Sequence, residues 1–152
     1  MVIELFQILT CLTLGLLIGS LLTEATILVP YWRTMDPEVF LDLHHTLGPK
    51  LMAYFAPLTI IATILPLITA LLPIVFGKQL PWLPFVTVFL TQSMLLLYFS
   101  YFKGANESFK TGDVGVEGLA DELSKGAKWH WLRVVVGFVA FTTSILVIHS
   151  PS

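Results

Sequence analysis

The fourth apolar segment of this chain opens with two groups that are able to do chemistry. The stretch reads Lys128-Trp129-His130-Trp131-Leu132-Arg133. In a helix, His130 and Arg133 share one face because they are three residues apart. An imidazole acts as a general base or a metal ligand near neutral pH, and a guanidinium stabilises an oxyanion. Tryptophans, however, are also typical of the membrane–water boundary. Two interpretations follow: an interface belt with an orientation-setting arginine, or an inward-facing site.

Other polar groups lie near the ends of the remaining apolar segments. Glu24 stands shortly before the first segment ends. His44 and His45 come before the second segment, and Asn106 follows the third. Ionisable groups inside a bilayer are costly, so each is a functional-site hypothesis by default. Because adjacent spans run antiparallel, all of these groups are expected at one end of the bundle, where sites are built from inward-facing side chains.

These groups predict a metal site made of nitrogen and oxygen ligands, which suits iron, zinc, copper or manganese. The expected ligands are Glu24, His45, Asn106 and His130. Simpler interpretations stand beside this one. Glu24 pairs with Arg133 or extends to the interface. His44 and His45 are adjacent and point to different faces, so at most one of them faces inward. Asn106 is also of a type common where helices end.

The composition is that of a membrane protein. Of the 152 residues, 56% are hydrophobic and 12% are charged, and the mean hydropathy is +0.86. Soluble domains carry about 25% charged residues. We expect one integral membrane domain over residues 1–152. The sequence has no basic run, so no nucleic-acid partner is expected. Cys11 is its only cysteine, which excludes an internal disulfide and a cysteine-based metal cluster.

Four segments are long enough to cross about 30 Å of hydrocarbon, which takes about 20 apolar residues. They cover residues 5–29, 51–72, 82–102 and 131–149. Because backbone groups in lipid are satisfied within helices, the sequence predicts an all-α transmembrane four-helix bundle with up-down-up-down order. A longer loop is expected before the last span, with a turn at 111–115 and a helix from about Val116 that runs into the span. Pro57 and Pro66 either kink the second span or are tolerated in it.

The cationic residues predict the orientation in the membrane. The connections 30–50 and 103–128 hold most of the lysines and arginines, whereas the connection between the second and third spans holds only Lys78. The positive-inside rule therefore places both long loops in the cytoplasm and both termini on the non-cytoplasmic side. The first span lacks the positive start of a signal peptide and is expected to be retained.

Three places in the chain carry a family resemblance. The first span contains Gly15 and Gly19 and ends in Val29-Pro30-Tyr31-Trp32, Asn106 follows the third span, and the fourth opens with Trp129-His130-Trp131-Leu132-Arg133. In these features the chain resembles the anthrone oxygenase-like family of small four-helix membrane proteins. The family's usual proline and second asparagine after the third span are replaced here by Asn106-Glu107-Ser108-Phe109. Characterised members oxidise polycyclic aromatic anthrones to quinones. The resemblance implies that His130 and Arg133 are active-site residues, with Asn106 as a third.

The leading hypothesis is a membrane oxidoreductase of the oxygenase type that acts on a hydrophobic, aromatic or quinone-like substrate at the cytoplasmic end of the bundle. His130 is the expected general base or ligand, Glu24 a second base or ligand, and Arg133 the group that stabilises an oxyanion. The expected pocket lining is aromatic: Trp32, Tyr54, Phe55, Trp129 and Trp131.

A non-enzymatic alternative is a small subunit of a larger membrane complex or of a homo-oligomer. Such a subunit would hold haem or a chlorin pigment through His45 or His130, because a single axial histidine suffices, or it would carry no cofactor at all.

Overall fold

The computed structural model describes residues 1–149, and regular structure in that range is entirely helical. The elements are α1 (Val2–Thr23), η1 (Glu24–Leu28), α2 (Val29–Trp32), α3 (Pro37–Val75), α4 (Trp82–Leu97), η2 (Tyr98–Phe102), α5 (Lys103–Thr111) and α6 (Gly115–His149). The elements α1, η1 and α2 follow one another without a break and make one rod, and α4, η2 and α5 make another. With α3 and α6 they give four rods, each long and apolar enough to cross a membrane.

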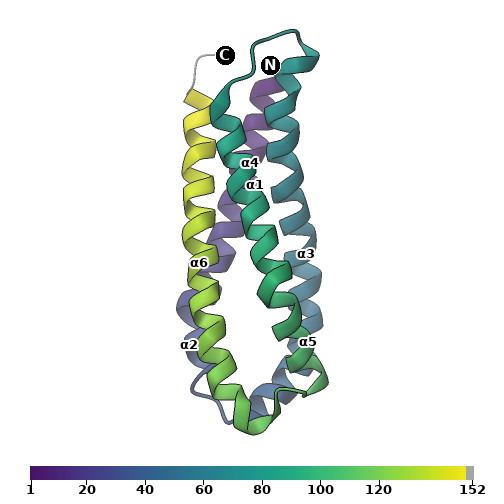
Figure 1. Ribbon diagram of the computed structural model, residues 1–152, viewed down its shortest axis with the longest axis vertical. Coiled ribbons are helices and arrows are strands. Elements are labelled where there is room, and N and C mark those ends of the chain that lie inside the picture. The colour runs from purple at the N-terminus through teal and green to yellow at the C-terminus, as the bar shows by residue number, and fades with distance from the viewer. Residues whose placement is uncertain (150–152) are drawn as a thin grey trace.

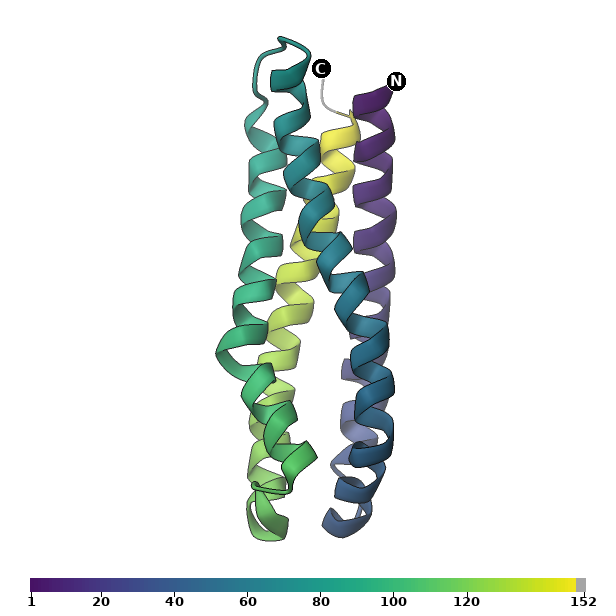
Figure 2. The same cartoon turned by 90° about the vertical axis from the view of Figure 1, so that its right-hand side faces the viewer.

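The four rods form an up-down-up-down bundle (Figures 1 and 2). The start of α1, the connection between α3 and α4, and the last turn of α6 lie at one end. The connections from α2 to α3 and from α5 to α6 lie at the other. Helix α1 packs against α3 and α6, and α4 packs against the same two helices. The predicted all-α membrane bundle is therefore confirmed.

The helices are longer than the predicted spans. Helix α3 has 39 residues, which at 1.5 Å per residue makes about 58 Å, almost twice the hydrocarbon thickness. The segments 30–50 and 103–128, predicted mainly as loops, are therefore mostly helical. The predicted helix that runs from about Val116 into the last span is confirmed by α6. Helix α3 also continues through Pro57 and Pro66, as expected where neighbouring helices satisfy the freed carbonyls.

Apolar side chains explain why these extensions stay helical and packed. A first core cluster fills the middle of the bundle with Leu14, Leu17, Ile18, Leu21, Ala25, Ala62, Met94 and Val134. A second core cluster lies in the extensions and consists of Trp32, Phe40, Leu119 and Leu123. Burial of this second set stabilises helices that polar loop residues alone would not hold.

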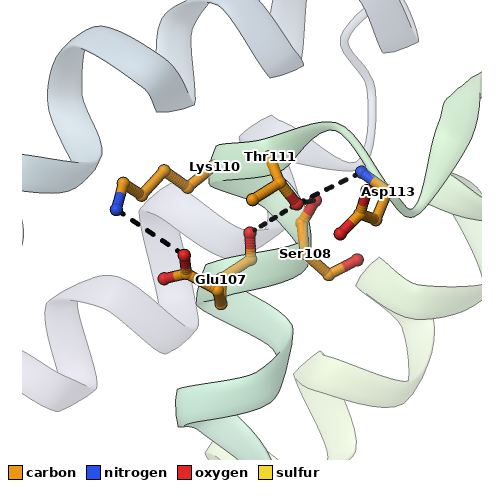
Figure 3. Close-up of polar contacts among 5 residues, drawn as sticks. All are labelled: Glu107, Ser108, Lys110, Thr111 and Asp113. Atoms are coloured by element: carbon orange, nitrogen blue, oxygen red, sulfur yellow. Dashed lines mark hydrogen bonds and ion pairs between the residues drawn. The ribbon is translucent and has the colours of Figure 1, made fainter.

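The turn from α5 to α6 is set by local hydrogen bonds (Figure 3). The Thr111 hydroxyl donates to the Glu107 carbonyl at 3.0 Å, and the Asp113 N–H donates to the Thr111 hydroxyl at 3.4 Å. Lys110 pairs with Glu107 at 3.6 Å. Gly112 then takes φ +78°, a left-handed conformation that ends the helix. This turn, predicted at 111–115, sends α6 back along α4 and so brings His130 into the bundle.

Candidate functional site

His130 points into the bundle, where its side chain is bonded to α1. The residue is 3% exposed, and its Nε2 lies 2.9 Å from the Leu21 carbonyl oxygen. A carbonyl only accepts, so Nε2 carries the hydrogen in this bond. In the neutral ring Nδ1 is then the atom with a free lone pair. Nδ1 makes no hydrogen bond to any residue between 1 and 149, which leaves it available as a base.

Glu24 stands beside the same imidazole. Its Oε2 lies 3.9 Å from His130 Nε2, and the side chain is 18% exposed. That distance is too long for a hydrogen bond, so the two groups are neighbours that attract when the imidazole is protonated. Glu24 also opens η1, where the Val29 N–H bonds to the Glu24 carbonyl five residues back. Short π-helical segments of this kind are rare and occur frequently at functional sites.

Arg133 is buried one turn further along α6. The residue is 7% exposed, its Cζ lies 5.4 Å from the centre of the Phe102 ring, and its Nε is buried without a hydrogen-bond partner. Within residues 1–149 its guanidinium makes no hydrogen bond and no ion pair within 4 Å. Glu24, Tyr98 and His130 interact with it electrostatically. A buried donor without an acceptor costs about 1–3 kcal/mol, so this arginine is retained at the expense of stability.

The second π-helical segment, η2, supplies aromatic rings to the site. Phe102 meets His130 edge-on, with ring centres 6.1 Å apart, and its face lies against Arg133. The Tyr98 hydroxyl makes a weak contact with the Met52 sulfur of α3 at 3.8 Å. The sequence alone does not point to these two rings or to the Leu21 carbonyl. The available signal was the aromatic run Tyr98-Phe99-Ser100-Tyr101-Phe102.

At the start of the fourth span, some residues lie as in an interface belt and others face inward, as in a site. Trp131 is 45% exposed, as in an interface belt, whereas His130 and Arg133 face inward. Trp129 stacks on Tyr101 at 5.4 Å and 11°. The Tyr101 hydroxyl in turn donates to Glu122 Oε1 at 2.7 Å. These contacts clamp the start of the fourth span to η2.

The aromatic pocket expected from the sequence is not assembled. Trp32 belongs to the second core cluster, where it packs on Phe40, and Phe55 packs on the first core cluster. Tyr54 is exposed and bonds to Ser20. Phe102 lies against His130 and Arg133 in place of these residues.

The expected metal centre is not assembled either. His45 is exposed, and its neighbour His44 is the one turned inward, where it stacks on Phe40 at 5.6 Å. The Asn106 side chain is partly buried and makes no hydrogen bond to another residue in 1–149. In that range, no three His, Cys, Asp or Glu residues come together in a way that would hold a metal.

Of the predicted ligand set, Glu24 and His130 are neighbours, whereas His45 is exposed. Zinc sites use three or four protein ligands, whereas two of the predicted ligands are neighbours here. Two neighbouring donors are fewer than such a centre needs, so the donor set present does not fit a metal site of this kind.

Comparisons with models of protein families, with curated proteins and with solved structures find no match to this chain. The resemblance described above stays a prediction that depends on its short motifs.

Proposed function

We propose that this protein is a membrane-embedded oxidoreductase of the oxygenase type that acts on a hydrophobic aromatic compound with an acidic C–H next to a ketone, as in an anthrone. The single observation that carries the proposal is the convergence of Glu24, His130 and Arg133 inside an apolar bundle, beside two π-helical segments. An unpaired buried cation and a free imidazole nitrogen have no evident structural use.

The chemistry divides into proton removal and oxygen addition. His130 Nδ1 takes a proton from the substrate CH₂, and the resulting negative charge on the substrate oxygen is stabilised by Arg133. Dioxygen, the oxidant, adds to the carbon to form a hydroperoxide. Loss of the second C–H proton and departure of water then leave a carbonyl. One CH₂ and one O₂ thus give one C=O and one H₂O. Glu24 stabilises the protonated imidazole at 3.9 Å.

The test uses the full chain purified in detergent and a hydroxyanthrone as substrate. With air we expect a quinone absorbance to develop faster than in protein-free detergent. Without oxygen, in D₂O, we expect the CH₂ protons to exchange for deuterium, because proton removal needs no oxidant. Absence of both activities would overturn the proposal, and exchange without quinone formation would restrict it to proton transfer.

We also propose that the site end of the bundle faces the cytoplasm. The lysine and arginine asymmetry of the sequence supports this orientation. Lys78, in the connection between α3 and α4, and Lys110, near the end of α5, are both exposed and lie at opposite ends. After Cys11→Ser, single Lys78→Cys and Lys110→Cys variants report the two sides. A membrane-impermeant maleimide should label intact cells at position 78 alone; labelling at position 110 alone would invert the topology.

A further inference from the structure

The Nε–H group of Arg133 is buried in the bundle without a hydrogen-bond acceptor among residues 1–149. The Nε atom is fully enclosed and has no acceptor in this part of the chain, although the guanidinium lies at a site that contains a carboxylate, Glu24. The Phe102 ring covers the guanidinium at 5.4 Å. The Nε–H points along the plane of the guanidinium, and there it has no hydrogen-bond acceptor among the described residues.

We propose that the Nε–H and the neighbouring Nη–H of Arg133 bind two coplanar oxygens of an aromatic ligand, as a carboxylate or as a ketone flanked by an ionised hydroxyl. Two parallel N–H groups match two oxygens in this arrangement, which a lysine cannot reproduce. We infer the aromatic part of the ligand from the Phe102 ring that lies over the guanidinium. This inference rests on the proposed function and names the substrate class of its site.

Access to Nε requires a small rearrangement. Because Nε is enclosed by protein atoms, a neighbouring side chain must move when the ligand oxygen arrives. Arg133 lies on the closing helix α6, and Phe102 lies in η2.

The experiment measures binding of anthracene carboxylate to the full chain in detergent through the probe's own fluorescence. The methyl ester of the same probe is the neutral control. We expect the carboxylate to bind at least about tenfold more tightly than the ester, and Arg133→Lys to remove about that factor, because lysine keeps the charge and loses the paired N–H edge. Arg33→Lys, at an exposed arginine, is the matched control and should bind like the parent protein.

Equal binding of carboxylate and ester by the parent protein would overturn the inference, as would unchanged carboxylate binding in Arg133→Lys. If that variant does not fold, the comparison of the two probes on the parent protein still decides. The result is separable from the proposed function. Carboxylate binding through Arg133 without quinone formation leaves the inference standing and removes the function. Quinone formation with an unchanged KM in Arg133→Lys leaves the proposed function standing and removes the inference.

Discussion

Replacing His130 with alanine is expected to lower the rate of quinone formation by about 100- to 10,000-fold, the usual contribution of a positioned general base. The variant removes Nδ1, the free lone pair of the site, together with the bond from Nε2 to the Leu21 carbonyl. The measurement is the initial rate of quinone absorbance with a hydroxyanthrone in air. Deuterium exchange at the substrate CH₂ without oxygen should fall by the same factor.

His130→Gln separates this chemical role from a structural one. A glutamine amide is able to donate to the Leu21 carbonyl, but it is not a base at neutral pH. We therefore expect His130→Gln to retain a Tm close to that of the parent protein while it loses activity as alanine does. A glutamine variant that oxidises the substrate at the parental rate would show that His130 only joins α6 to α1.

Replacing Glu24 with leucine is expected to lower the free energy of unfolding by about 2 kcal/mol, which is below the ~3–5 kcal/mol lost when one partner of a direct buried pair is removed. Glu24 interacts electrostatically with Arg133, but the two do not form an ion pair within 4 Å. Without the carboxylate, Arg133 is a buried charge with no opposite charge beside it. Unfolding in detergent, followed by circular dichroism, measures the change.

A second substitution identifies the cause of that loss. Adding Arg133→Met to Glu24→Leu should recover most of the stability, because it removes the buried charge that Glu24→Leu leaves uncompensated. Asp121→Leu, at an exposed carboxylate of α6, is the control and should change stability by less than about 0.5 kcal/mol. If Glu24→Leu is as stable as this control, the carboxylate does not compensate Arg133.

Part of the candidate site could be predicted from the positions of its residues in the sequence, and part could not. That Glu24 and His130 lie at the same end of the bundle follows from the position of each group near the same end of its span, and three-residue spacing places Arg133 on the same face as His130. The contact between Glu24 and His130 and the inward direction of that face are seen only in the structure. His45 was the wrong choice of the two adjacent histidines. Their spacing is compatible with either face, and the stacking of His44 on Phe40 depends on how α3 is rotated against α5.

The π-helical segments could not be predicted for a related reason. An i→i−5 turn differs from an α-helical turn by one inserted residue, and neither Glu24–Leu28 nor Tyr98–Phe102 carries a local signal for it. The insertion rotates every later side chain of its rod around the helix axis. The rotation turns Phe102 toward Arg133.

The amino-acid sequence by itself determined that this protein is a four-helix membrane bundle, because hydrocarbon thickness and the need to satisfy backbone hydrogen bonds leave few other solutions. It also determined which end of the bundle collects the ionisable groups, since alternating direction follows from the number of spans. Only the tertiary structure decided which of those groups meet. Contact requires that two helices be correctly rotated and in register, and both are set by close-packed side chains from distant parts of the chain. That packing joined His130 to the Leu21 carbonyl and left the Nε of Arg133 without an acceptor.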